Sequence, residues 1–269
     1  MAREIDTIYN LSIGMEMVPT IPSFRLDGKA ALVTGAGRGI GFAAAAALAQ
    51  AGARVTLAAR TAGEIEAACD ALNAAGGVTD AMVLDITDSA RVSEAINELG
   101  PFDVLVNSAG MNRPMNLVDV TDEDLDAVIA LNVKATFYVS RAVSKGLLNA
   151  KKPGSIVNVS SQMGHVGSPG RTVYCATKHA IEGMTKALAW ELGPQQIRVN
   201  TVCPTFIETA FTQNMFEKPG FRNWVTSKIA LGRVGRIEET MGAVVFLASD
   251  ASSLVTGSAL MLDGGWTAA

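Results

Sequence analysis

The sequence is short of the features that mark several protein classes. It carries only three cysteines, Cys69, Cys175 and Cys203, which are widely spaced and stand outside any Cys-x-x-Cys or Cys/His cluster. An odd, scattered set of this kind indicates neither a disulfide framework nor a zinc site, so we expect no metal. Free cysteines suit a reducing compartment, and we expect a cytoplasmic protein.

The sequence also lacks an excess of basic over acidic residues and a long run of apolar residues. The chain has 22 Lys and Arg residues against 26 Asp and Glu residues, which gives a net charge of −4. This balance provides no basic surface for nucleic acid. No stretch approaches the ~20 apolar residues of a membrane span. We therefore expect a small-molecule substrate as partner, with no nucleic acid and no membrane.

The length and composition indicate one folded domain. The chain has 269 residues, 49% of them apolar, without a linker-like break in composition. Residues 1–26 lack the basic start and unbroken apolar core of a signal peptide, because Glu4, Asp6 and Glu16 interrupt them. We therefore expect an N-terminal extension over 1–26 and a single domain over 27–269.

From Lys29 onward, short apolar runs alternate with longer stretches of helical spacing. This alternation is typical of an α/β fold with a doubly wound, Rossmann-type parallel sheet and helices on both faces. The predicted strands are Ala30–Thr34, Arg54–Ala58, Ala81–Asp85, Val104–Asn107, Ser155–Ser160, Arg198–Cys203 and Ala259–Leu262. The predicted helices lie near 40–51, 62–75, 88–98, 122–149, 173–192 and 237–249. Ligands of such a sheet bind beyond the carboxyl ends of its strands.

The loop after the first predicted strand is rich in glycine. It reads Thr-Gly-Ala-Gly-Arg-Gly-Ile-Gly over 34–41 and leads into an alanine-rich helix. Glycines let the backbone approach a pyrophosphate, and a helix N-terminus supplies free N–H groups with a positive partial charge. A glycine cluster alone often marks a tight turn. Strand, loop and helix in this order predict a dinucleotide phosphate site.

A hydroxyl, a phenol and an ammonium occur close together further along the chain. Tyr174 and Lys178 are four residues apart in a stretch of helical spacing, so they share one helix face. A nearby ammonium favours the phenolate and makes Tyr174 a candidate acid or base. Ser161 follows a predicted strand, and a Gly/Pro-containing loop could return it to the tyrosine. Without other motifs, a tyrosine and a lysine four residues apart on a helix are more often a packed phenol and a solvated amine.

Together these elements resemble the short-chain dehydrogenase/reductase family. The glycine loop, the Asn-Ser-Ala-Gly turn at 107–110, Asn132 and the Ser161, Tyr174, Lys178 set match its order and spacing over about 27–266. The resemblance implies that the domain over 27–269 binds a nicotinamide dinucleotide, carries out hydride transfer and forms a homotetramer. The helices that bear Asn132 and Tyr174 would pair with a neighbour. Two departures are Ser108 in place of Asn and Thr205 in place of Gly.

The resemblance also implies residue roles. Tyr174 would give or take the substrate proton, Ser161 would orient the reacting oxygen, and Lys178 would lower the pKa of Tyr174. Asn132 would hold a water next to Lys178, although from its type alone it is a structural residue of its helix. The implied cofactor residues are Gly35, Arg38, Gly39, Ile40, Gly41, Arg60, Asp85, Ile86, Asn107, Ala109, Gly110, Tyr174, Lys178, Pro204, Ile207 and Thr209.

The end of the second predicted strand bears on the choice of cofactor. An acid about 20 positions beyond the glycine loop would bind the ribose hydroxyls of NAD and repel a 2′-phosphate. Ala59 stands there, Arg60 follows it, and Arg38 lies within the loop. Two guanidiniums without a carboxylate favour a phosphate, so we predict NADP(H), with NAD(H) left open. The alternative for Arg60 is a solvated side chain.

Loops near the predicted pocket supply candidate substrate residues, namely Arg113, His165, Arg171 and Trp224. The histidine and the arginines could bind a hydroxyl or carboxylate, or lie in exposed loop surface. Residues 205–233, with a break at Pro219-Gly220, form a candidate lid or simply pack two small helices. The chain looks most like family members that act on polyols, sugars or sugar acids. A 3-oxoacyl-thioester reductase and a non-catalytic dinucleotide-binding regulator stay open.

Overall fold

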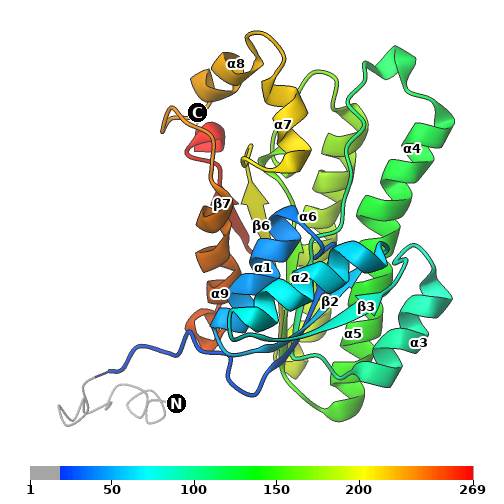
Figure 1. Cartoon of the computed structure of the whole chain (residues 1–269), viewed down its shortest axis with the longest axis vertical. Coiled ribbons are helices and arrows are strands. Elements are labelled where there is room, and N and C mark those ends of the chain that lie inside the picture. Colours follow the sequence, from blue (N-terminus) through cyan, green and yellow to red (C-terminus); the bar gives the residue numbers. More distant parts are fainter. Residues whose placement is uncertain (1–18, 269) are drawn as a thin grey trace, which may run out of the picture.

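The structure, a computed structural model, describes residues 19–268, apart from the side chain of Phe211. Most of the extension predicted over 1–26 lies outside the described residues. The described chain alternates strands and helices (Figure 1). No helix within it is long and apolar enough to cross a membrane.

Within residues 19–268, seven parallel strands form one sheet in the order β3-β2-β1-β4-β5-β6-β7. The chain therefore builds outward from β1 in one direction and then from β4 in the other. Such a switch point opens a crevice at the carboxyl ends of the strands. The strands are β1 (Ala30–Thr34), β2 (Arg54–Ala59), β3 (Val78–Val83), β4 (Val104–Asn107), β5 (Gly154–Val159), β6 (Ile197–Pro204) and β7 (Ala259–Leu262). The predicted doubly wound parallel sheet is confirmed.

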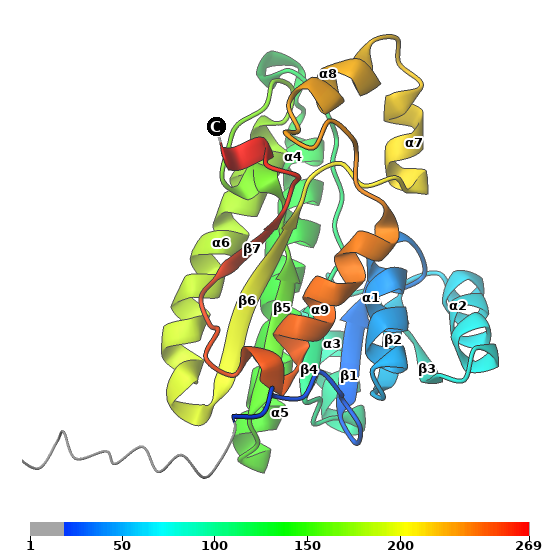
Figure 2. The ribbon, with the colours of Figure 1, turned by 90° about the vertical axis from the view of Figure 1, so that its left-hand side faces the viewer.

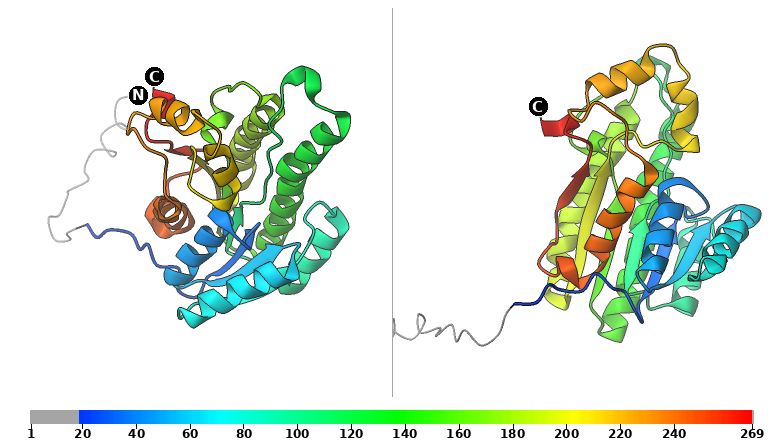
Figure 3. Two further views of the ribbon diagram at one scale, coloured as in Figure 1. Left: turned by 45° about the horizontal axis from the view of Figure 1, so that its top comes forward. Right: turned by 60° about the vertical axis from the view of Figure 1, so that its left-hand side comes forward.

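Helices cover both faces of the sheet (Figures 2 and 3). One apolar core joins α1 (Gly39–Gln50), α2 (Ala62–Ala74) and α9 (Met241–Ala248) to one face. A second core joins α3 (Ser89–Leu99), α5 (Thr136–Ala150) and α6 (Thr172–Leu192) to the other. α4 (Asp122–Ile129) precedes α5. Each fully buried Val, Leu or Ile in these cores stabilises the fold by about 1.5–3 kcal/mol.

Small side chains bring α1 close to the sheet. Residues 43–47 are five consecutive alanines, all buried, beside α9 and β1. β4 is buried at all four positions, which explains why its sequence is a continuous apolar run rather than an alternating one. Close packing at this helix fixes its N-terminus at the carboxyl edge of the sheet.

Three elements differ from the prediction. β3 begins at Val78 rather than Ala81, and Asp85 lies in the following loop. β3 is the edge strand and buries only Thr79 and Met82, so its apolar pattern is weak. The helix predicted over 122–149 is divided by a π-helical turn, η2 (Ala130–Ala135). The helix predicted over 237–249 begins as a 3₁₀ turn, η5 (Ile237–Thr240), and becomes α-helical only at Met241. The other predicted strands and helices begin and end within one residue of the observed bounds.

Two short helices stand beyond the carboxyl ends of β6 and β7, at the top of Figures 1 and 2. α7 (Ala210–Phe216) and α8 (Phe221–Ser227) follow β6. Gly220 separates them with a φ of 76°, a conformation that favours glycine. The predicted break at Pro219-Gly220 is therefore confirmed.

Candidate active site

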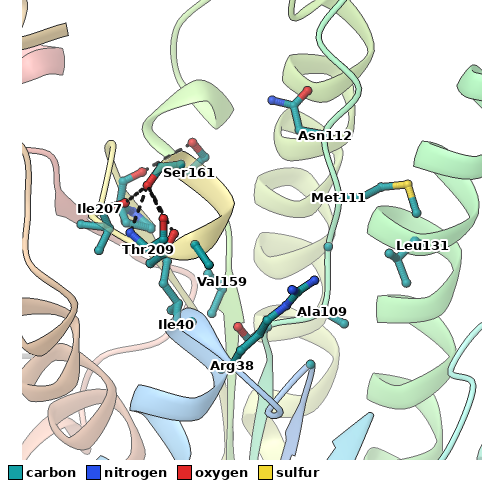
Figure 4. Close-up of a pocket in the computed structure, with 18 of the residues that line it drawn as sticks. Arg38, Ile40, Ala109, Met111, Asn112, Leu131, Val159, Ser161, Ile207 and Thr209 are labelled. Carbon is teal, nitrogen blue, oxygen red and sulfur yellow. Dashed lines mark hydrogen bonds between the residues drawn. The ribbon is translucent and has the colours of Figure 1, made fainter. Parts of the chain in front are cut away.

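A pocket of about 380 Å³ opens at the carboxyl ends of the strands, where the switch point predicts it. The glycine loop forms one end, and the ends of β4, β5 and β6 line the remainder. Figure 4 shows Arg38 at the lower end of this pocket, Ser161 near Ile207 and Thr209, and Met111 and Leu131 on the opposite side. The volume is in the range of small-molecule sites.

The glycine loop has the shape of a phosphate cradle. A Cβ at Gly41 would lie 2.2 Å from the carbonyl oxygen of Gly35, and one at Gly35 would lie 2.7 Å from Cα of Ala109. Gly39 has a φ of 60° and faces open space. No side chain caps the N-terminus of α1, and its first turn has no acid. Free N–H groups at this end suit a diphosphate, so the loop fits the predicted cofactor.

Arg38 and Arg60 both line the glycine-loop end of the pocket. Among residues 19–268, neither forms an ion pair with a carboxylate. Hydrogen bonds from Thr87 lower the pKa of Asp85, with a smaller contribution from the charge of Arg60. Glu64 also lines this end and approaches Gly37, a position that sequence reasoning missed. Its place one turn into the helix after the second strand could have indicated it.

The other predicted cofactor residues divide into two groups. The pocket lining includes Gly35, Gly39, Ile40, Gly41, Ile86, Ala109, Gly110, Pro204, Ile207 and Thr209. Asn107 lies below the pocket, where its amide donates to Ser140 and Asn158. The Asp85 carboxylate accepts from Thr87 instead of facing the pocket. Asn107 and Asp85 thus support the loops around the pocket.

Ser161, Tyr174 and Lys178 all line the same pocket. Ser161 caps the 3₁₀ turn η3 (Gln162–Gly164), and its hydroxyl donates to Oε1 of Gln162 at 2.8 Å. Nζ of Lys178 donates to the carbonyl of Val159 at 2.8 Å and lies 5.5 Å from the centre of the Tyr174 ring. Sequence reasoning missed Gln162, although its place next to Ser161 is a signal.

Burial governs the ionisation of Tyr174 and Lys178. Desolvation raises the pKa of Tyr174 to about 12, while the Ser161 hydroxyl and the Arg171 charge act in the opposite direction. Desolvation also lowers the pKa of Lys178 to about 8. Lys178 is not among the groups that shift the pKa of Tyr174, and its lowering of that pKa beside the charge of an oxidised cofactor stays a prediction. The ammonium is held against Val159 beside the ring.

Asn132 lies buried in the π-helical turn η2. Its amide donates to the carbonyl of Met111 and to Oγ1 of Thr177, and its Oδ1 accepts from the N–H of Met111. These bonds tie the loop after β4 to α6. They match the structural alternative for Asn132, and its role in holding a water stays a prediction.

The four candidate substrate residues have different surroundings. Arg171 lines the pocket and is 8% exposed; its Nη1 has no hydrogen-bond partner, and its Nη2 lies 3.3 Å from Sδ of Met215. His165 instead faces Glu182 and Cys203 behind the pocket. Arg113 pairs with Asp124 at the surface. Trp224 packs against Phe221 and Trp266 in the aromatic cluster of the segment after β6.

The segment after β6 packs its two short helices together, and its role as a lid stays a prediction. Its aromatic residues pack with Met163 and Trp266 in a small core of their own, which matches the packing alternative. Thr212 and Met215 of α7 also line the pocket. The segment therefore forms part of the pocket wall.

A family model described as Enoyl-(Acyl carrier protein) reductase matches residues 35–267. The chain is 42% identical over 245 residues to the 3-oxoacyl-[acyl-carrier-protein] reductase FabG of Thermotoga maritima, covering 90% of this chain and 98% of the relative. It is 40% identical over 244 residues to the L-xylulose reductase of Bos taurus, covering 91% and 98% respectively. These relatives match almost the whole chain.

A solved structure gives a similar result. The gluconate 5-dehydrogenase of Burkholderia cenocepacia, in complex with NADP and tartrate, superposes with a TM-score of 0.88 at 34% identity, over 91% of this chain and 98% of that one.

Proposed function

We propose, because the chain belongs to the short-chain dehydrogenase/reductase family, that it is an NADP(H)-dependent oxidoreductase interconverting an alcohol and a ketone on a sugar acid. Arg171 is the observation that carries the substrate class. Its buried guanidinium lines the same pocket as Ser161 and Tyr174, and no carboxylate among residues 19–268 pairs with it. A buried charge needs a counter-charge, which a substrate carboxylate supplies bidentately.

The cofactor assignment rests on the glycine-loop end of the pocket. Arg38 and Arg60 offer two guanidiniums to a 2′-phosphate, and the last residue of β2, Ala59, offers no acid to a ribose diol. The carboxylate at this end of the pocket, Glu64, lies beside Gly37. When bound, the cofactor supplies or accepts a hydride at C4 of its nicotinamide. The N-terminus of α1 and the glycine loop would hold its diphosphate.

The remaining chemistry is proton transfer and orientation by the chain's own residues. In reduction, the Tyr174 phenol gives its proton to the carbonyl oxygen as that oxygen becomes an alcohol. Ser161 donates a hydrogen bond to the same oxygen in place of Gln162. Arg171 holds the substrate carboxylate and so fixes the reacting carbon. In oxidation, the phenolate of Tyr174 takes the proton back.

The test combines a substrate panel with one variant and a matched control. Absorbance at the nicotinamide band is followed with NADP⁺ and NAD⁺ separately, against aldonic acids and neutral polyols of equal length. In Arg171→Gln we expect KM for the acids to rise roughly 10- to 100-fold, which corresponds to a charged hydrogen bond of about 1.5–3 kcal/mol. KM for neutral polyols stays level. Arg113→Gln, at a surface ion pair, leaves both unchanged.

If Arg171→Gln raised KM equally for the acids and for the neutral polyols, the sugar-acid assignment would be wrong and a polyol or sugar would be the substrate. A second candidate, a 3-oxoacyl-thioester reductase, is favoured by the 42% identity to the Thermotoga maritima enzyme. Turnover of a β-ketoacyl thioester, with none on the acid and polyol panel, would establish it. Tight NADPH binding without turnover of any of these would point to the non-catalytic regulator.

Further proposals concern the chain as a whole. We propose a catalytic domain over 27–269 preceded by an extension over 1–26, because the first strand begins at Ala30. The last residue of the extension, Leu26, is buried against the domain. All three cysteines are free, which supports a reducing, cytoplasmic location. We also propose a homotetramer, and exposed apolar side chains on α5 and α6 support the pairing of these helices between subunits.

A further inference from the structure

Three potential metal ligands meet behind the pocket, outside the residues assigned to catalysis. They are Nε2 of His165, Oε1 of Glu182 and Sγ of Cys203. The imidazole nitrogen lies 3.5 Å from the sulfur and 3.5 Å from the carboxylate oxygen, and the sulfur lies 3.3 Å from that oxygen. One residue comes from the loop after η3, one from α6 and one from β6.

The three atoms have the spacing of ligands around a tetrahedral zinc ion. Zinc bonds of about 2.3 Å to sulfur and about 2.0–2.1 Å to nitrogen and oxygen place such ligands roughly 3.3–3.6 Å apart at tetrahedral angles. The observed triangle has sides of 3.3, 3.5 and 3.5 Å. A thiolate, an imidazole and a carboxylate are also the donor types that zinc takes in proteins.

The surroundings support a held ligand set. Glu182 and Cys203 are buried, and the His165 side chain is 29% exposed, which leaves an entry path. Oγ1 of Thr201 donates to the second carboxylate oxygen of Glu182 at 3.1 Å, as outer-shell partners of metal-bound carboxylates do. The buried hydroxyl of Ser160 has no hydrogen-bond partner and lies beside the Cys203 side chain. Its oxygen is a fourth polar atom next to the triangle.

We propose that His165, Glu182 and Cys203 form a zinc-binding site. Binding replaces the thiol proton of Cys203, which passes to solvent, and the thiolate and carboxylate together balance the two charges of the ion. The ion would join three segments that each carry a residue of the pocket lining. Ser161 lies four positions before His165, Lys178 lies four positions before Glu182, and Pro204 directly follows Cys203. Its role is to hold the pocket wall, and it takes no part in hydride or proton transfer.

The test uses the full chain without a histidine tag, freed of metal by a chelator and titrated with Co²⁺. Tetrahedral Co²⁺ with one thiolate gives strong visible d–d bands and a sulfur-to-metal charge-transfer band in the near ultraviolet. We expect both to appear with one equivalent of Co²⁺ and to vanish when Zn²⁺ is added. In His165→Gln and Cys203→Ser, we expect Zn²⁺ affinity, measured by competition with a chromophoric chelator, to fall at least ~100-fold.

The chain offers matched controls, because its other histidine and cysteines lie elsewhere. His179→Gln and Cys69→Ser should bind Co²⁺ with the parent spectrum. His165 is on a partly exposed loop, so its variant gives an answer even if Cys203→Ser does not fold. A spectrum without the thiolate band, or unchanged Zn²⁺ affinity in His165→Gln, would overturn the site and leave a hydrogen-bonded triad. Because this readout needs no substrate, it is independent of the proposed activity.

Discussion

Tyr174 is the residue on which the proposed proton transfer depends. It lines the pocket with Ser161 and faces Lys178 across its ring. Removing the phenol oxygen in Tyr174→Phe takes away the acid and base but leaves the ring in place. We expect kcat to fall by about 10²- to 10⁴-fold, the usual contribution of general acid–base catalysis. NADPH affinity, measured by fluorescence titration, is expected to stay within a few-fold of the parent value.

Tyr138 on α5 provides the control for this substitution. It lies outside the pocket lining, so Tyr138→Phe should retain the parent kcat. A Tyr174→Phe variant that kept substantial activity would place the proton donor elsewhere.

The ionisation of Tyr174 and Lys178 leads to a pH prediction for the two reaction directions. Their pKa values of about 12 and about 8 leave both side chains protonated below about pH 8. Oxidation needs the phenolate, whose fraction grows about tenfold per pH unit below the pKa. We therefore expect kcat/KM for oxidation to rise about tenfold per pH unit in this range. Reduction needs the phenol, and its kcat/KM is expected to stay level.

The measurement is a pair of pH–rate profiles in buffers of constant ionic strength. An oxidation profile that is already flat near neutral pH would show that the tyrosine pKa is lowered in the working complex. In that case bound cofactor and substrate would lower the pKa of Tyr174 by more than desolvation raises it.

At the scale of elements, the turn between β1 and α1 shows why its glycines are required. A Cβ at Gly41 would overlap the backbone of Gly35, which has no flexible side chain to move away. We expect Gly41→Ala to displace the loop and to weaken NADPH binding at least ~10-fold, since a misplaced cradle loses N–H bonds to the phosphate. Isothermal titration with NADPH measures this.

Gly63, in the first turn of α2, is the matched control. A Cβ there would meet no atom within 4 Å. Gly63→Ala should keep the parent affinity and stabilise the protein by no more than about 1 kcal/mol, measured by urea unfolding. If Gly41→Ala bound NADPH as the parent does, the loop would not be the phosphate cradle.

The sequence predicts elements well where one physical signal dominates. The central strands are buried on both faces, so continuous apolar runs reveal them, and β1 and β4 have the predicted bounds. The edge strand β3 lacks that signal, and its position was wrong by three residues at its start. The π-helical turn around Asn132 has no periodicity of its own in the sequence. Its hydrogen bonds to Met111 and Thr177 join distant parts of the chain.

At the scale of the whole molecule, contacts between distant residues decide what the sequence alone can show. Ser161, Tyr174 and Lys178 are predictable as a set because two of them share a helix face and the third follows a strand. His165, Glu182 and Cys203 have no such spacing, and only the packing of a loop, α6 and β6 brings them together. The burial of Arg171 without an acidic partner among residues 19–268 is likewise a property of the folded pocket.

The outer face of α5 and α6 carries apolar side chains that the described fold leaves in solvent. Phe137 and Leu148 on α5 are 43% and 41% exposed, and Trp190 on α6 is 87% exposed. Large exposed apolar groups on adjoining helices are typical of an interface between subunits. They support the proposed pairing of these helices with their counterparts in a second copy of the chain.

Trp190→Lys tests this assembly directly. A charge at the centre of an apolar interface loses hydration without gaining a partner, which costs several kcal/mol and is repeated by symmetry in the second copy. We expect light scattering at micromolar concentration to give a tetramer for the parent chain and a smaller species for Trp190→Lys. Val78→Lys, on the exposed edge strand β3 at the far end of the sheet, should remain tetrameric. A parent chain that ran as a monomer would show that the apolar face of α5 and α6 serves another purpose.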